Sequence, residues 1–429
     1  MADPQGRAFN LPFKEQAAFF QRKVNVPTQR WDDLQREDHA HGFMVAGVTR
    51  MDMLDDFRQA VEQYQAGATL EQFRTDFDRI VAKYGWSYRG SRNWRSRIIA
   101  ETNLRTSYQA GRWEQLQAIK HRRPYWEYVH ADGEAHPRPQ HLAWNGKVLS
   151  ADDPWWGVHY PPNGWGCKCT VRALSPRDLA ARGKDGPDPA PEDPPQADGQ
   201  PAGVDKSFDY NVGTAARSMP AAVRFGQRVM GLPPAWRDAV LADAQRRPTD
   251  LFADWPAVVT RAVGETAALA RQPKGTAHPL GFLRPQVAQA LEAGAGLEER
   301  RFVAPRADTA LLGADDTQVY HALRSATGAV DARLAQALKE LPQRLADPAT
   351  TVLWDTAPPD QRNAAPSLIY AWALQDGRWV KAVFRLDERR GGRAMRKAQL
   401  AANWLVTVEI VEAYNLAEAK YVRLAGEVK

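Results

Sequence analysis

The residues with the most chemical potential lie close together, in the segment HPRPQHLAWNGKVLSADDPWWGVHYPPNGWGCKC at positions 136–169. This segment holds three of the nine histidines of the chain and both of its cysteines. In an extended strand, residues two apart point to the same side, so Cys167 and Cys169 would present both sulfurs to one site. Together with His136, His141 or both, they would complete a tetrahedral zinc site that holds the fold together.

Two other interpretations of these residues stay open. Buried thiols and hydrogen-bonded histidines can pack under tryptophans without a metal, and a Cys-x-Cys pair alone is a weak zinc signal. A nucleophilic cysteine beside a histidine is the third interpretation. The sequence offers that nucleophile no orienting acid, because Asp132, Asp152 and Asp153 are typical of turns.

The bulk composition sets limits on the class of protein. A chain of 429 residues exceeds what one hydrophobic core usually serves, so we expect at least two domains. Its 44% apolar and 25% charged residues are typical of a globular protein, and no apolar run is long enough for a membrane span. The beginning of the sequence lacks the features of a signal peptide, and two nearby cysteines cannot build a disulfide scaffold. We therefore expect synthesis in a reducing cytoplasm and no membrane partner.

The elements that must position the cluster are mainly helices. TLEQFRTDFDRIVAKYG begins with Thr69 and Gln72 in capping-box spacing and ends at Gly85, which predicts an amphipathic helix. A second long helix is predicted from about 94 to 120. After Trp126 the pattern changes to turns and short extended pieces, ending in CKCTVRAL, which predicts a strand.

The second half of the sequence has a different organisation. SPRDLAARGKDGPDPAPEDPPQADGQPAG contains seven prolines and few large apolar residues, which is typical of a linker. Residues 214–300 have helical patterns, followed by a helix around 317–346 and several strands. SLIYAWAL and WVKAVFRL form a predicted antiparallel hairpin that turns at Asp376-Gly377.

These patterns predict an α+β protein, with a mainly helical N-terminal domain and a small C-terminal α+β domain built on an antiparallel sheet. The expected limits are 1–173 for the N-terminal domain, 174–206 for the proline-rich linker, 207–275 for a helical connector and 276–429 for the C-terminal domain.

Positive charge is concentrated between Lys83 and Arg123, in a chain with a pI near 9.2. Such a block could contact nucleic-acid phosphates, or it could be a solvated helix face or a protein interface. The candidate nucleic-acid contacts are Arg89, Arg92, Arg95, Arg97, Arg105, Arg112, Arg122 and Arg123.

The motifs of the first half occur in a distinctive order. WRSRIIAETNLRTSYQAGR is followed by Arg138-Pro139-x-His141, Asn145-Gly146, Pro161-Pro162-Asn163-Gly164 and the cysteine pair. Over about residues 10–213, the sequence resembles the head-morphogenesis domain of the phage Mu protein F (MuF) family of minor capsid proteins. Family members usually have Cys-Arg-Cys where this chain has Lys168, which keeps the charge but loses the planar guanidinium.

The resemblance implies a minor head protein of a Mu-like tailed phage. It implies no enzymatic activity for this N-terminal domain. It implies association with the portal inside the head and a role in assembly, packaging or ejection of the genome. The expected partners are the portal protein, the major capsid protein and packaged double-stranded DNA. The expected location is the capsid interior near the portal, after assembly in the host cytoplasm.

The last third of the chain is similar to phage-borne domains grouped with barnase-like, colicin-like and RelE-like nucleases. That resemblance implies either a metal-free ribonuclease, delivered with the genome as an effector, or an inactive relative that only binds. Proton transfer and phosphate binding in such an enzyme would fall to His321, Arg324, Lys381 and Arg385. The basic run DERRGGRAMRKAQ could serve nucleic acid or an acidic protein surface.

Overall fold

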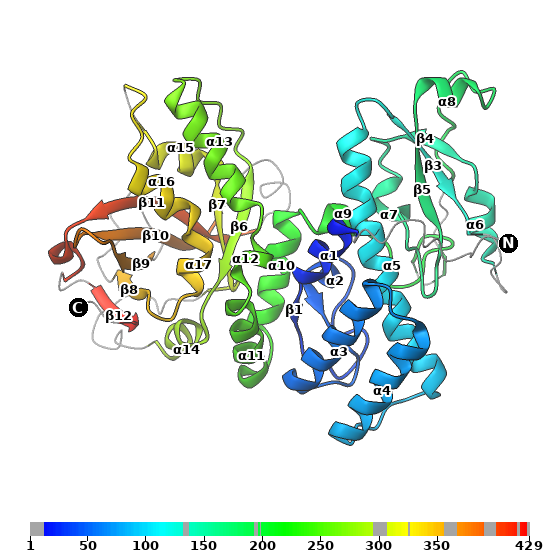
Figure 1. The fold of residues 1–429 in the computed structure, drawn as a ribbon, viewed down its shortest axis with the longest axis horizontal. Helices are drawn as coiled ribbons and strands as arrows, with labels where there is room; N and C mark the ends of the chain where they lie inside the picture. The colour runs from blue at the N-terminus through cyan, green and yellow to red at the C-terminus, as the bar shows by residue number, and fades with distance from the viewer. Residues whose placement is uncertain are drawn as a thin grey trace. The chain divides into compact units, whose positions relative to one another are not determined.

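The structure is a computed structural model that describes residues 13–131, 137–192, 196–197, 199–294, 307–324, 327–355, 367–389, 400–417 and 421–426. The chain divides into two compact units, Met1–Arg217 and Ser218–Lys429 (Figure 1). Each unit has its own core, and each combines helices with a sheet. This confirms the α+β class predicted from the sequence. None of the helices in the described ranges is both long enough and apolar enough to cross a membrane.

The first unit opens with a helical layer. Phe20, Phe57 and Phe77 are fully buried between its helices. The predicted helix after Thr69 is present: the Thr69 side chain accepts from the backbone of Gln72, and Gly85 ends the helix in a left-handed conformation. The elements are α1 (Lys14–Gln21), β1 (Val24–Asn25), α2 (Asp38–His41), β2 (Gly42–Phe43), α3 (Met51–Gln65), α4 (Leu70–Tyr84) and α5 (Arg92–Ile119).

A three-stranded antiparallel sheet of order β4-β3-β5 follows the long helix α5. Its core is rich in tryptophan, and Trp126 and Trp156 are almost completely buried in it. Short helices connect the strands and carry much of the aromatic packing. The elements are β3 (Tyr125–Val129), α6 (Pro139–Trp144), β4 (Val148–Ser150), α7 (Trp156–His159), β5 (Thr170–Leu174) and α8 (Pro176–Ala180).

The proline-rich segment leaves the first unit and returns to it. Val204, Phe208 and Val212 are buried in the tryptophan-rich core, so the chain on the far side of the prolines packs with the residues before them. The last element is α9 (Val212–Ala215), where Gly213 lies so close to Trp113 that a Cβ would be 2.1 Å from that side chain. The first unit therefore extends to Arg217 instead of ending near 173.

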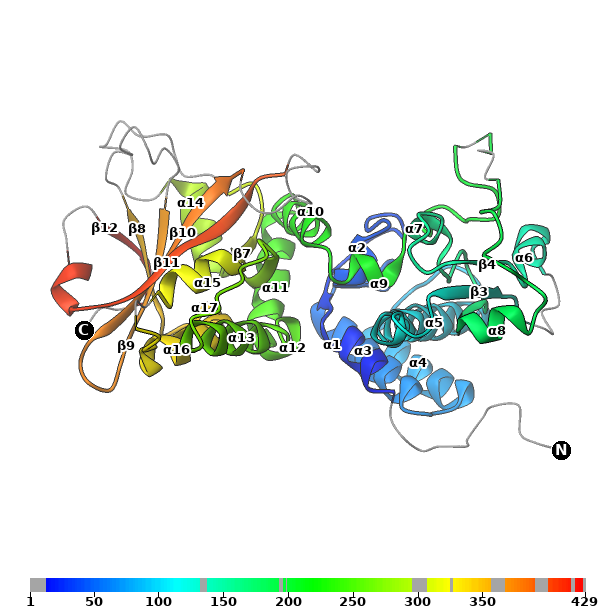
Figure 2. The same cartoon turned by 90° about the horizontal axis from the view of Figure 1, so that it is seen from above.

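The second unit is built on a seven-stranded sheet of order β12-β8-β9-β10-β11-β7-β6 (Figure 2). Neighbouring strands are antiparallel except β11 and β7, which are parallel. The predicted hairpin is present between β9 and β10, with Gly377 at φ +84° in its turn. The strands are β6 (Ala277–Phe282), β7 (Leu311–Asp315), β8 (Thr351–Asp355), β9 (Ser367–Ala373), β10 (Trp379–Glu388), β11 (Ala402–Val411) and β12 (Tyr421–Ala425).

Helices precede and cover this sheet. The sequence predicted one helix around 317–346, and this was wrong: the described residues of the region form three short helices. Asp331 starts the second of them with a side-chain cap, and Pro342 is at the start of the third. The helices are α10 (Met219–Met230), α11 (Pro234–Gln245), α12 (Pro248–Leu251), α13 (Trp255–Ala267), α14 (Pro285–Ala293), α15 (Asp316–Ala322), α16 (Ala332–Lys339) and α17 (Leu341–Ala346), with the 3-10 helix η1 (Ala413–Leu416) after β11.

Candidate metal centre and basic surfaces

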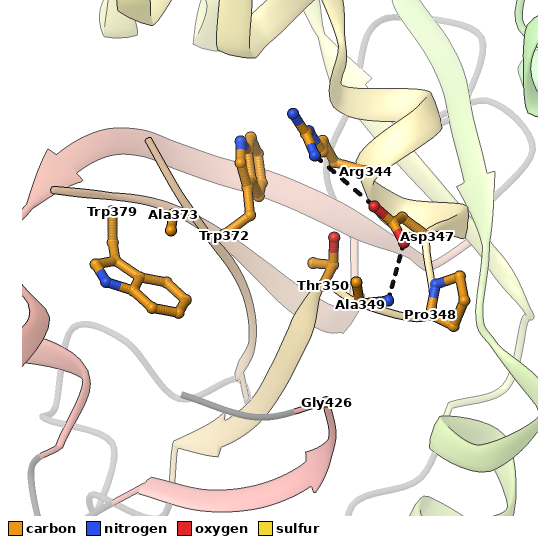
Figure 3. Close-up of a pocket in the computed structure, with 9 residues that line it drawn as sticks. All are labelled: Arg344, Asp347, Pro348, Ala349, Thr350, Trp372, Ala373, Trp379 and Gly426. Atoms are coloured by element: carbon orange, nitrogen blue, oxygen red, sulfur yellow. Dashed lines mark hydrogen bonds and ion pairs between the residues drawn. The ribbon is translucent and has the colours of Figure 1, made fainter. Parts of the chain in front are cut away.

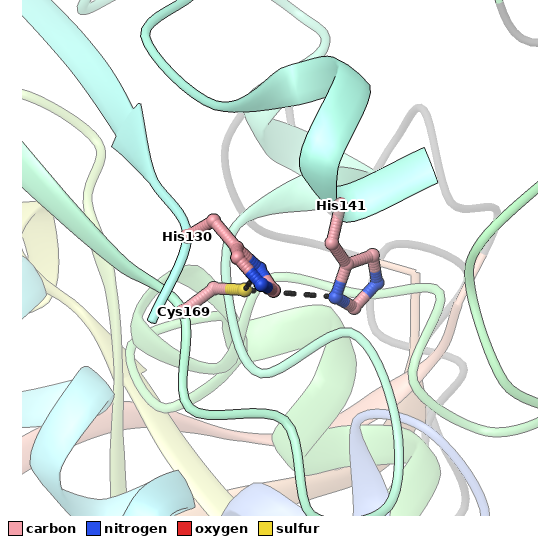
Figure 4. A group of neighbouring side chains, drawn as sticks. All are labelled: His130, His141 and Cys169. Atoms are coloured by element: carbon pink, nitrogen blue, oxygen red, sulfur yellow. Dashed lines mark hydrogen bonds between the residues drawn. The ribbon is translucent and has the colours of Figure 1, made fainter. Parts of the chain in front are cut away.

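The histidine and cysteine cluster lies where three parts of the N-terminal unit meet (Figure 4). His130 follows β3 directly, His141 is on α6, and Cys167 and Cys169 come just before β5. β3 and β5 are antiparallel neighbours, with the last residue of β3 opposite the first residue of β5. One step further in this register places His130 opposite Cys169, so the sheet itself brings these two residues together.

The ligand atoms of these side chains converge. His130 Nδ1 is 3.4 Å from Cys169 Sγ, and His141 Nδ1 is 3.5 Å from the same sulfur. His141 Nδ1 is also 3.8 Å from Cys167 Sγ. Figure 4 shows both rings turned toward the sulfur of Cys169. The ligand atoms of His130, His141 and Cys169 all lie within 4.8 Å of one another, so these side chains could hold a metal ion.

All four side chains are buried, with exposed fractions from 1% to 6%, and both cysteines are free thiols. A hydrogen bond from Cys167, with help from His141, holds the pKa of the Cys169 thiol well below its ordinary range. The hydrogen bond to Cys169 and burial raise the pKa of Cys167. The cluster therefore favours one thiolate, which is the form of cysteine that binds metals.

Further polar contacts fix the orientation of the cluster. His141 Nε2 lies 2.8 Å from the Gly203 carbonyl oxygen, which can only accept, so this nitrogen carries a proton and, in the neutral ring, Nδ1 keeps the free lone pair. Asn145 Oδ1 accepts from the His130 backbone N–H, and Gln109 donates to the Cys169 carbonyl. These contacts hold the ring and the sulfur in place from outside the cluster.

Aromatic side chains enclose the cluster. Trp144 stacks on the ring of His141 with ring centres 5.2 Å apart, and Trp155 stacks on His159 at 4.3 Å. Tyr128 packs edge-on against Trp144 and donates its hydroxyl to Asn163. Such an apolar shell excludes water and keeps the donor atoms in one arrangement.

Comparison with known proteins connects this core to a phage family. A family model described as phage Mu protein F like protein matches residues 53–172, which include the cluster. This domain belongs to the phage Mu protein F-like family. The capsid assembly protein F of Escherichia phage Mu is 36% identical over 190 residues, 39% of this chain and 42% of that protein. The Mu-like prophage FluMu F protein of Haemophilus influenzae is 37% identical over 168 residues, 36% of this chain and 40% of that protein.

The chain thus spans less than half the length of these two relatives. No solved structure matches it. The Mu F-like domain comprises the matched residues and the rest of the first compact unit, which packs with them.

The Mu F-like domain brings together three of the four predicted metal ligands: His141, Cys167 and Cys169. His136 lies outside the described residues. The sequence analysis missed His130, because its closeness to Cys169 follows from strand pairing and not from spacing along the chain. The alternation of YWEYV just before His130 was the available signal. The cysteines themselves precede β5 instead of lying within it.

The arginines of the basic block do not form one surface stripe. Those on α5 point in several directions, because its turn of 3.6 residues places Arg97, Arg105 and Arg112 each about 140° or more from Arg92 around the axis. Several are already engaged in the described structure. Arg92 pairs with Asp78, Arg123 with Asp178, and Arg95 donates to the Ala46 carbonyl and lies over Trp86. Arg112 donates to Gln115, and the Nε atom of Arg105 is buried.

The four residues proposed for catalysis come from the end of α15 and from β10 in the C-terminal unit. His321 and Arg324 are exposed at the end of α15. Lys381 and Arg385 are on β10, about 13 Å apart along the strand. Lys381 Nζ is 3.7 Å from Glu409, and Arg385 is 3.6 Å from Glu388. Among the described residues, no hydrogen bond or ion pair joins any two of the four side chains.

A pocket of about 480 Å³ opens elsewhere in this unit (Figure 3). Arg344, Asp347 and Thr350 line it on one side, and Trp372 and Trp379 on the other. Arg344 pairs with Glu340 and lies over Trp372. His321, Arg324, Lys381 and Arg385 are not among its lining residues. The basic run at 387–399 lies almost entirely outside the described residues.

Proposed function

We propose that this chain is a minor head protein of a Mu-like tailed phage and acts in assembly of the capsid. The observation that carries the proposal is the family match over residues 53–172, since it falls on the tryptophan-rich core and its cluster of histidines and cysteines. The name of the phage Mu relative, a capsid assembly protein, supports the same role. The finer parts of the proposal are association with the portal, a place inside the capsid after assembly in the host cytoplasm, and help with packaging or ejection.

An exposed aromatic pair on the Mu F-like domain fits a docking surface. Trp31 and Trp165 are each 38% exposed, and their rings meet edge to face at 6.0 Å. Lys206 Nζ lies 5.6 Å over the ring of Trp31, and Phe208 packs against Trp165. Tryptophans in such positions contribute much of the binding energy of protein interfaces. We propose this pair as the contact for the portal protein or the major capsid protein.

The test is incorporation into particles. In a phage that encodes this chain, Trp31→Ala with Trp165→Ala should reduce the protein in purified heads at least tenfold, while Trp94→Ala leaves it unchanged. Trp94 is a fair control because it is 45% exposed, lies on α5 and is not among the residues that line a pocket with Trp31 and Trp165. Normal incorporation of the double variant would refute the docking surface. Heads that form and infect normally without the protein would refute the assembly role.

Contact with packaged double-stranded DNA is the second part of the proposal. Arg89, Arg97 and Arg122 are exposed and have no ion pair within the described part of the chain. They, and not the whole basic block, are therefore the residues we propose for phosphate contacts. Replacing the three by glutamine should flatten the salt dependence of binding to duplex DNA, by roughly one unit of slope per lost contact.

For the C-terminal unit we propose binding in preference to catalysis, with a ribonuclease effector as the alternative. The glutamates beside Lys381 and Arg385 support this choice, because they already pair with the two cations. Expression of the full chain beside His321→Ala tests it. Cleavage of total RNA by the wild type that is lost in the variant would establish the effector instead.

We also propose that the cluster in the Mu F-like domain binds zinc in a structural role. Burial of all four side chains supports a closed site, since catalytic zinc keeps an open position for water or substrate. The zinc would tie the strand, the helix and the loop that carry the ligands into the platform that presents the docking surface.

A further inference from the structure

We propose that one zinc ion is bound tetrahedrally by Cys167, Cys169, His130 and His141, each histidine using its Nδ1 atom. This inference rests on the structural metal role proposed above and specifies its ligands. It replaces the ligand set that sequence spacing favoured, in which His136 took the place of His130.

The distances between donor atoms fit this ion. Zinc binds thiolate sulfur at about 2.3 Å and imidazole nitrogen at about 2.0–2.1 Å, so a tetrahedral site separates sulfur from nitrogen by roughly 3.6 Å. The three sulfur-to-nitrogen distances in the cluster are 3.4, 3.5 and 3.8 Å. The donor atoms of these three pairs already have the spacing of the tetrahedron.

Hydrogen bonds alone leave the cluster unsatisfied. His141 Nδ1 can only accept, because Nε2 holds the ring proton against the Gly203 carbonyl. Cys169 Sγ faces both His141 Nδ1 and His130 Nδ1: as a thiol it has one proton for two nitrogens, and as a thiolate it has none. A cation at the centre would satisfy every one of these donor atoms at once.

Backbone pairing explains why His130 belongs to the set. Its position opposite Cys169 follows from the β3–β5 register, and its backbone N–H is fixed by Asn145. His141 reaches the same sulfur from α6, where Trp144 stacks on its ring. Each ligand is thus held by an element of the fold, as structural zinc sites require.

The first measurement is the metal content of the full chain, purified without a chelator. We expect about one zinc per chain in the wild type, and less than about a fifth of that in His130→Ala and Cys169→Ser. His136→Ala is the matched control and should keep its zinc. Cobalt exchanged for zinc should give the visible absorption of a tetrahedral site with sulfur-to-metal charge transfer.

Replacing one metal-binding side chain by another controls for variants that lose zinc only because they misfold. His130→Cys should retain the metal and strengthen the cobalt charge-transfer band, because a third sulfur joins the site; His136→Cys should leave the spectrum unchanged. Zinc that persists in His130→Ala, or is lost in His136→Ala, would overturn the ligand assignment alone. A wild type without any bound metal would overturn the metal role itself. Neither result would affect the proposed role in head assembly, which is measured in particles.

Discussion

Replacing Lys23 by methionine tests whether a buried ammonium group limits the stability of the Mu F-like domain. Lys23 follows α1 and is only 3% exposed. Its Nζ lies 4.8 Å from the ring centre of Phe19 and 5.9 Å from that of Phe20, and within the described residues no carboxylate pairs with it. Burial, together with the charge of Arg58, lowers the pKa of Lys23 from 10.5 to about 7.

The pKa shift sets the size of the effect. One pKa unit corresponds to about 1.4 kcal/mol, so the shift from 10.5 to about 7 amounts to roughly 5 kcal/mol of destabilisation below neutral pH. The two phenylalanine rings offset part of this by attracting the cation, by about 1 kcal/mol. We therefore expect Lys23→Met to raise the free energy of unfolding by about 2–4 kcal/mol at neutral pH.

The same two pKa values determine whether the stability of the wild type rises or falls with pH. The unfolded chain keeps the lysine proton up to pH 10.5, whereas the folded chain releases it above about pH 7. Because the unfolded state binds more protons in this window, the wild type gains stability as the pH rises through it. The variant lacks this gain, so the difference between the two proteins should shrink toward pH 10.

The assay is urea unfolding followed by tryptophan fluorescence, at pH 7 and at about pH 9.5. Lys14→Met is the matched control, since Lys14 is an exposed residue of α1, and its replacement should change stability by less than about 0.5 kcal/mol. A Lys23→Met variant that is less stable than the wild type, or that shows the same pH dependence, would refute the reasoning.

Three further changes have defined outcomes. Gly111→Ala should cost about 1–3 kcal/mol in thermal unfolding, because its Cβ would lie 2.6 Å from the Gln16 backbone nitrogen where α5 crosses α1. Thr69→Ala removes the capping box of α4 and should cost about 1 kcal/mol in the same assay. Burial raises the pKa of Asp387 to about 6, so native stability falls as the pH rises from 3.8, where the carboxyl ionises in the unfolded chain, to about 6, where it ionises in the folded chain. Asp387→Asn should therefore be more stable than the wild type above pH 6 and equal to it below pH 3.8 in a pH series of melting temperatures.

Local signals in the sequence were sufficient where one short stretch determines the structure. The capping box at Thr69 and the glycine at the end of α4 define that helix without help from the rest of the fold. The turn at Asp376-Gly377 defines the β9–β10 hairpin for the same reason, because few residues other than glycine accept its positive φ.

Pairing between strands that are far apart in the chain could not be predicted from the sequence. His130 joins the cluster only because β3 and β5 pair in one register, and no spacing along the chain encodes that register. Strand β6 was missed because Pro279 and Gly281 weaken its strand pattern, although pairing with β7 overrides them. The sequence also did not predict that the helix expected at 317–346 is interrupted. Apolar residues continue a helical period through this region, across Gly328 and across the cap that starts α16.

The return of the chain to the first unit after the prolines changes what a protease could do to this protein. Residues 204–216 are locked in place: Asn211 caps α9 and donates to the Trp156 carbonyl, Gly213 rests on Trp113, and the Gly203 carbonyl binds His141. A cut in the proline-rich segment would leave both pieces bound to each other, because residues 204–216 are packed in the core of the first unit. Cleavage there would nick the protein without separating residues 204–217 from the core of the first unit.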